Sequence, residues 1–121
     1  VARPLEIAGE RIVPVSGHHS ERFEVTGYRI GRMAYLTDFK TIADAEVGKL
    51  IGVELLVVNA LRFRPHPSHF NVEEALALIA RVAPRRALIT HVSHEIGRHA
   101  ATTALLPRGV ELAYDGLEII I

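Results

Sequence analysis

The chain of 121 residues contains no cysteine. Disulfides and thiolate ligands are therefore excluded, so any bound metal ion must rely on histidine, carboxylate or water. The absence of cysteine also permits a cytoplasmic location, which we take as the expectation. Lysine plus arginine and aspartate plus glutamate both number 14, which gives a formal net charge of zero. A neutral chain offers no electrostatic basis for binding nucleic acid or an anionic membrane surface.

Long apolar runs and phosphate-binding glycine motifs are also missing. The hydrophobic stretches are too short to span a bilayer. Neither G-x-x-x-x-G-K-S/T nor G-x-G-x-x-G occurs, which removes the usual signal for a phosphate-cradling loop. The only methionine is Met33 and the chain begins Val1-Ala2-Arg3, so we expect it to be part of a longer protein.

The composition and the order of predicted helices and strands fit one globular α/β domain over residues 1–121. Hydrophobic residues make up 49% and charged residues 23%, as expected for a packed core. The strongest helix signal lies at 71–84, where apolar residues follow the helical period and Asn71 and Glu74 form a capping-box pair. The continuous apolar run at 54–60 predicts a strand covered on both sides. Further strands are predicted at 11–15 and 86–90, and further helices at 41–52, capped by Thr41, and at 94–107.

Two hairpins are predicted from their turn residues. Gly31-Arg32 suits a type II′ turn, and Asp115-Gly116 between apolar segments predicts a closing hairpin over 110–121. The polar segment 16–24 is expected to be a loop. Strands at 54–58 and 86–89 are each reached through a helix, so they should be parallel neighbours.

Histidine or aspartate follows the predicted strands in four successive connections. These residues are His18 and His19, Asp38, His66 and His69, and His91 and His94. Functional groups collect past the strand C-termini in layered α/β folds, and imidazoles with a carboxylate suit a hydrolytic metal site. The sequence therefore predicts a metal site at this edge.

Each of these residues could also have a purely structural role or be an ordinary surface residue. Asp38 could cap a turn, and His66 and His69 could be solvated residues around Pro67. Adjacent residues of an extended segment point in opposite directions, so at most one of the first histidine pair should enter a site. The i, i+3 pair of His91 and His94 is weak evidence on its own, and we place His94 behind the ligands or at the substrate edge. A further histidine, His99, is expected on a solvated helix face.

Four segments in this order resemble the C-terminal half of metallo-β-lactamase-fold hydrolases: GYRIGRMAYLTD, LLVVNALRFRPHPSHFNVEEAL, RALITHVSHEIG and LPRGVELAYDGLEI. The pattern is most similar to the cyclic phosphodiesterases linked to phosphonate degradation. The resemblance implies an α/β fold in which this chain forms the C-terminal half of an αββα sandwich. That half is a mixed sheet with helices on one face.

The resemblance also implies roles for individual residues. Asp38 would bridge two metal ions, His91 would be a ligand, and His69 would lie near the substrate phosphate as general acid or phosphate binder. A further ligand precedes the GYRIG hairpin; His19 fits when counted from Pro14, and His18 remains open when counted back from that hairpin. The implied cofactor is a divalent metal, zinc or manganese, with two ions in a complete site.

The family motif histidine-x-histidine-x-aspartate-histidine does not occur in this sequence. We therefore expect the chain to supply only part of a two-metal site. One half of such a sandwich would leave the inner sheet face bare, and either the N-terminal half of the same fold or a homodimer partner should cover it.

The favoured function is metal-dependent hydrolysis of a small phosphodiester, cyclic ones included, by the protein to which this chain belongs. The alternative is a non-catalytic half-domain that dimerises or pairs with another chain. The joint presence of Asp38, His69 and His91 favours the enzyme, because a pure scaffold has no need for them. A third reading, a small-molecule-binding α/β domain with unrelated histidines, lacks the phosphate loop that would support it.

Overall fold

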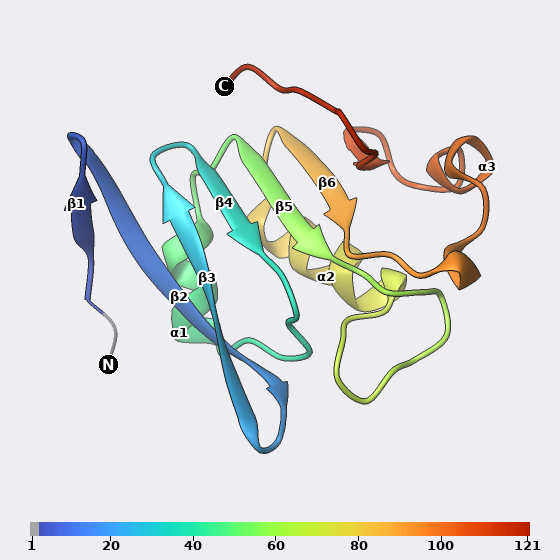
Figure 1. The fold of residues 1–121 in the computed structure, drawn as a ribbon, viewed down its shortest axis with the longest axis horizontal. Coiled ribbons are helices and arrows are strands. Elements are labelled where there is room, and N and C mark those ends of the chain that lie inside the picture. The colour runs from blue at the N-terminus through green and yellow to red at the C-terminus, as the bar shows by residue number, and fades with distance from the viewer. Residues whose placement is uncertain (1–2) are drawn as a thin grey trace.

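The computed structural model describes residues 3–121 and consists of one seven-stranded mixed sheet with short helices (Figure 1). The strands lie in the sheet in chain order, from β1 to β7. Their bounds are β1 Leu5–Ile7, β2 Glu10–Ser20, β3 Phe23–Ile30, β4 Met33–Leu36, β5 Leu55–Asn59, β6 Arg86–Thr90 and β7 Val110–Leu112. The helices are α1 Asp44–Val47, α2 Val72–Val82 and α3 His99–Thr103, with 3-10 turns η1 Gly48–Leu50 and η2 His94–Ile96.

The sheet changes from antiparallel to parallel at β4. Strands β1 to β4 pair antiparallel, whereas β4 to β7 pair parallel, with Leu36 opposite Val58 and Asn59 opposite Thr90. The expected parallel pairing of the strands at 54–58 and 86–89 is confirmed. This register aligns the ends of β4, β5 and β6, so the residues that follow them emerge at one edge.

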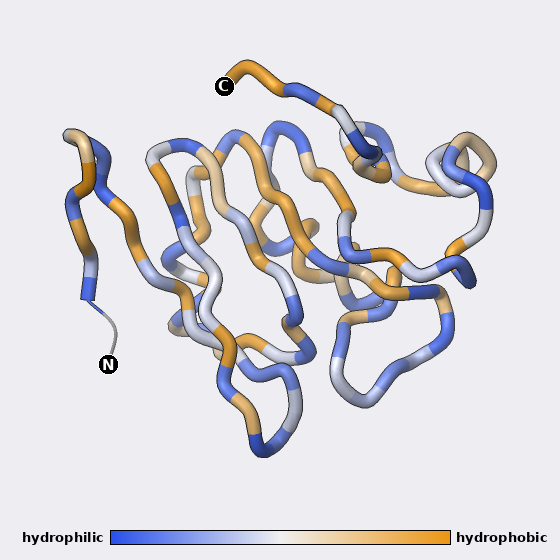
Figure 2. Tube along the Cα trace, in the orientation of Figure 1, coloured by the Kyte–Doolittle hydropathy of each residue, from blue (hydrophilic) through white to orange (hydrophobic). Residues whose placement is uncertain are grey.

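The main core lies between the sheet and the helices α1 and α2, which sit behind the sheet in Figure 1. Leu56 and Val58 of β5 are fully buried on this side. Leu55 and Val57 point to the opposite face, where the C-terminal segment covers them through Leu117 and other side chains. Strand β5 is therefore apolar on both sides, as predicted, and is orange along much of its length in Figure 2.

The strongest local signals are confirmed. Helix α2 has Asn71 as its N-cap, and the reciprocal hydrogen bonds between Asn71 and Glu74 form the expected capping box. Ile30 pairs with Met33 around the turn at 31–32, and Gly31 has the positive φ of 57° that suits a glycine there.

The expected loop at 16–24 is wrong. Strand β2 runs on to Ser20, and His18 pairs with Glu24 of β3 in a long hairpin. Polar composition suggested a loop, but the alternation of exposed and buried residues along β2 is that of a strand. Gly17 is buried at this point because Phe39 fills the space beside it.

Two of the predicted helices are much shorter than expected. The segment 41–52 is helical only from Asp44, with Ala43 rather than Thr41 at the N-cap, because the backbone of Thr41 pairs with His18. The segment 94–107 is divided at Gly97, whose φ of 97° ends the turn η2 before α3 begins.

The predicted closing hairpin at 110–121 is also wrong. Strand β7 pairs with β6, and a turn forms at Tyr114, but the following residues make no strand. Leu117 and Ile119 instead pack on the sheet face beside Leu55. The apolar character of this segment is thus used for packing on the sheet. Within residues 3–121 there is no helix with the length and hydropathy of a membrane span.

Candidate metal centre

Two candidate ligands stand at strand ends in an unusual backbone conformation. Asp38 follows β4 with a φ of 64°, and His91 follows β6 with a φ of 56°. A residue with a side chain pays a conformational cost in this left-handed region, on the order of 1–3 kcal/mol, and such residues gather at functional sites. The conformation turns each side chain out of its strand direction.

A buried asparagine holds the turn that carries Asp38. The side chain of Asn59, at the end of β5, accepts a hydrogen bond from the backbone N–H of Phe39 at 2.9 Å. Its amide donates to the carbonyl of Phe39, also at 2.9 Å. Asn59 is fully buried, so both bonds are shielded from water. The sequence reading missed Asn59, although a polar residue ending a wholly apolar strand was a usable signal.

Four histidines form a cluster beside Asp38: His19 near the end of β2, His66 and His69 after β5, and His91 after β6. The ring of His69 is the centre, with ring centroids 4.6 Å from His19, 5.1 Å from His66 and 5.0 Å from His91. The carboxylate oxygen Oδ1 of Asp38 lies 3.2 Å from Nε2 of His91 and 3.8 Å from Nδ1 of His69. The residues that the sequence singled out at separate strand ends are therefore neighbours in space.

The adjacent residues His18 and His19 have different surroundings in the structure. His18 is exposed, whereas His19 turns toward the cluster, with its Nδ1 at 3.0 Å from the backbone carbonyl of Asp38. A carbonyl oxygen only accepts, so Nδ1 of His19 carries the proton and Nε2 keeps a free lone pair. This is the arrangement by which metal-binding histidines are commonly oriented. The geometry thus favours His19 over His18 as the candidate ligand.

The side chains fit a metal ion best around His19, Asp38 and His69. One ligand atom from each of these three residues lies within 4.8 Å of the others. Nδ1 of His69 is buried and has no hydrogen-bond partner within the described part of the chain. Buried polar atoms are nearly always satisfied, so this lone nitrogen calls for a further partner such as a metal ion. His69 therefore suits a ligand role as well as the substrate-side role that the resemblance implies, and His91 reaches the group through Asp38.

The surroundings of His69 favour its uncharged form. Burial lowers the pKa of His69, and the neighbouring His19, His91 and His66 lower it further, against the opposing effect of Asp38. Neutral imidazole is the form that binds metal. With one carboxylate among four imidazoles, the cluster offers the nitrogen and oxygen donors of a zinc or manganese site without choosing between them.

The remaining histidines lie outside this cluster. His94 begins η2 and is exposed. His99 is exposed at the start of α3, as expected, and in addition its Nε2 is 2.9 Å from the carbonyl of Leu112 and its ring packs on Tyr114. His99 thus joins the start of α3 to the end of β7.

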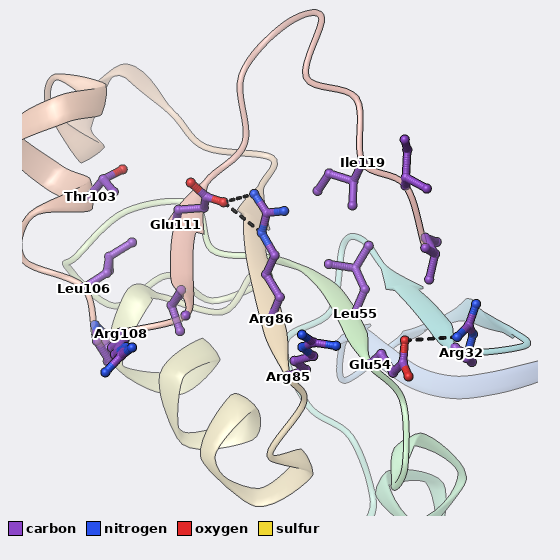
Figure 3. A pocket seen from close by; sticks show the side chains of 15 residues that line it. Arg32, Glu54, Leu55, Arg85, Arg86, Thr103, Leu106, Arg108, Glu111 and Ile119 are labelled. Carbon is purple, nitrogen blue, oxygen red and sulfur yellow. Dashed lines mark hydrogen bonds and ion pairs between the residues drawn. The ribbon is translucent and has the colours of Figure 1, made fainter.

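A cavity lies away from the histidine cluster. It measures about 870 Å³ and lies at the opposite ends of the parallel strands, beneath the C-terminal segment (Figure 3). Two of its arginines, Arg32 and Arg86, are already paired with Glu54 and Glu111. The candidate chemistry lies at the other edge of the sheet, where the metal-binding side chains converge.

Known proteins similar to the chain agree with this architecture. A family model described as a beta-lactamase superfamily domain matches residues 2–92. A crystal structure of a diphosphatase from the PhnP family is 37% identical, with a TM-score of 0.94 over 100% of this chain and 47% of its own length. The metallo-β-lactamase fold protein YhfI from Bacillus subtilis is 18% identical, with a TM-score of 0.72 over 94% of this chain and 51% of its own, and shows the fold alone.

A curated relative has a different name. An octanoyltransferase from Porphyromonas gingivalis (strain ATCC BAA-308 / W83) is 38% identical over 119 residues, which are 98% of this chain and 24% of that protein. The chain therefore spans less than half of the diphosphatase and about a quarter of the octanoyltransferase. The family match and the similarity to these structures show that the chain belongs to the beta-lactamase superfamily, in its metallo-β-lactamase fold and with a PhnP-like relationship.

Proposed function

We propose that the protein to which this chain belongs is a metal-dependent phosphodiesterase acting on a small phosphodiester, cyclic ones included. The superfamily is hydrolytic and its fold implies a bound divalent metal. The observation that carries the proposal is the convergence of His19, Asp38, His69 and His91 at one sheet edge. The diphosphatase relative supports a phosphorus substrate for the same chemistry.

The clustered residues would have different roles in the proposed hydrolysis. His19, Asp38 and His91 would hold divalent metal, which when bound supplies a water of lowered pKa and stabilises negative charge on the phosphate. Asp38 lies between His91 and His69, so its carboxylate would supply the oxygen ligand of the group. As the water oxygen bonds to phosphorus, the ester P–O bond breaks and the leaving oxygen needs a proton. His69, at the centre of the cluster, would take up the proton released by the attacking water and pass it to the leaving oxygen, or it would bind the phosphate.

Acyl transfer, the activity named for the octanoyltransferase relative, has less support in this chain. A thiol nucleophile is excluded because the chain has no cysteine. The relative is about four times as long as the segment matched here, so its named activity need not reside in that segment.

We further propose that the face of the sheet opposite the helices is covered by the N-terminal half of the same fold. Leu5, Ile7, Tyr28, Ile30 and Tyr35 all lie on this face and are 38–58% exposed. Exposed apolar patches of this kind mark interfaces. The diphosphatase supports this occupant, since all of this chain matches only 47% of that enzyme. A homodimer partner on this face is the competing outcome, which the mass of the full-length protein in solution would reveal.

The central test uses the full-length gene product. It should bind about two divalent ions, measured by inductively coupled plasma mass spectrometry, and should hydrolyse bis(p-nitrophenyl) phosphate. His91→Ala should remove at least one ion and most of the activity, whereas His18→Ala should leave both unchanged. Unchanged metal content in His91→Ala would refute the ligand assignment, and metal-loaded protein without phosphodiesterase activity would refute the proposed reaction.

A further inference from the structure

His66 is the clustered histidine to which the sequence analysis assigned no individual role. The structure places its ring 5.1 Å from that of His69, and the side chain is only partly exposed. Unlike the other three, it makes no hydrogen bond or ion pair with Asp38 within residues 3–121. It therefore stands at the rim of the candidate centre.

The proton of His66 can be located from one hydrogen bond. Its Nδ1 lies 3.0 Å from the backbone N–H of Ser68, which can only donate. Nδ1 must then be the acceptor, so the imidazole is neutral and carries its hydrogen on Nε2. A protonated ring nitrogen has no lone pair for a metal ion, but it is a good donor to an anionic oxygen. His19 has the reverse arrangement, with its proton on Nδ1 and a free Nε2.

The surrounding charges favour the same neutral form. Burial lowers the pKa of His66, and so do the positive charges of Arg62 and Lys40, with a smaller contribution from His19. Glu95 opposes this shift. The neutral ring that the Ser68 hydrogen bond requires is therefore also the form that these surroundings favour.

The loop around His66 is fixed by Arg62. Its guanidinium donates to the carbonyl of Pro65 at 2.8 Å and to that of Arg64 at 3.3 Å, and it approaches a carboxylate oxygen of Glu95 at 3.5 Å. Pro65 and Pro67 on either side of His66 restrict the backbone further. Since Glu95 belongs to the connection after β6, Arg62 also ties the loop of His66 to the loop of His91. The donor is therefore held in place before any ligand arrives.

From this geometry we infer that His66 is a substrate-binding residue, which donates a hydrogen bond from Nε2 to a phosphate oxygen and is not a metal ligand. Arg62 is its positioning residue. The inference rests on the proposed function, because it needs an anionic phosphorus substrate at the cluster. It assigns the first histidine of the HPSH segment to the substrate.

The test compares His66→Ala, His66→Gln and the exposed control His18→Ala in the full-length gene product. His66→Ala should keep its full metal content, while kcat/KM for bis(p-nitrophenyl) phosphate falls about 10- to 100-fold, the usual effect of a hydrogen bond to a charged group. The binding constant for inorganic phosphate, measured by calorimetry, should weaken about tenfold or more. His66→Gln retains a donor and should recover part of both losses, and the control should match the wild type.

Each contrary result points to a different failure. Loss of metal in His66→Ala would show that His66 is a ligand, and unchanged kcat/KM and phosphate affinity would show that it does not touch substrate; either overturns the inference. A wild type that binds metal and phosphate but hydrolyses no phosphodiester would refute the proposed reaction alone, and phosphate affinity would still decide the role of His66. A metal-loaded wild type without phosphate affinity would overturn both.

Discussion

The substitution Asn59→Leu tests the idea that a buried amide positions the metal-binding aspartate. Leucine has nearly the same shape, so the change removes two hydrogen bonds without opening a large cavity. The N–H of Phe39 would lose its acceptor in the core, which costs about 1–3 kcal/mol. The carbonyl of Phe39 keeps its bond from the backbone N–H of Phe70 at 2.8 Å, so the second loss is smaller, about 0.5–1.5 kcal/mol.

The two losses together predict a decrease of about 3 kcal/mol in the free energy of unfolding. Asp38 directly precedes Phe39 and holds a left-handed φ of 64° that only the surrounding contacts maintain. Metal affinity should therefore fall about 10- to 100-fold, as for other residues that orient a ligand.

Val58→Ala is the matched control, because Val58 precedes Asn59 on β5 and is fully buried but has no hydrogen bond to the turn. It should cost about 2 kcal/mol of stability and leave metal affinity unchanged. Both variants would be compared in the full-length gene product by urea unfolding of the metal-free form and by competition with a chelator for metal. An equal loss of affinity in the two variants, or none in Asn59→Leu, would refute the positioning role.

Three further outcomes are expected. Gly17→Ala would place a methyl group 2.3 Å from the ring of Phe39, so urea unfolding should show a loss of about 1–3 kcal/mol or more in the free energy of unfolding. The control Gly48→Ala lies in a helical, open position and should be neutral or stabilising, and equal effects of the two variants would contradict this packing. The metal-free protein should lose stability as pH falls below about 6.5, because the lowered pKa of His69 in the folded state means that the unfolded chain binds more protons there. His69→Gln should make the free energy of unfolding less dependent on pH in this range, and greater stability in acid would contradict the argument. The 121-residue segment alone should hydrolyse bis(p-nitrophenyl) phosphate far more slowly than the full-length protein, and robust turnover by it would show that its own ligands suffice.

Short-range patterns predicted the central part of the fold. The apolar run of β5, the capping box of α2 and the glycine turn at 31–32 each depend on residues close in sequence, and all three are present. Segments whose structure depends on distant partners were predicted wrongly. The strand through His18 is defined by pairing with β3, and the segment after β7 packs on the sheet instead of forming a hairpin.

The sequence by itself determined which residue types stand at the strand ends, and their order matched a known hydrolase pattern. It could not determine which of them meet, because that depends on the parallel register that aligns β4, β5 and β6. Only the tertiary structure distinguished His19 from His18, brought His66 beside His69 and showed Asn59 holding Phe39. The physical reason is that the proton position of His19 and the turn that carries Asp38 are set by hydrogen-bond partners about 20 residues away, which no local pattern records.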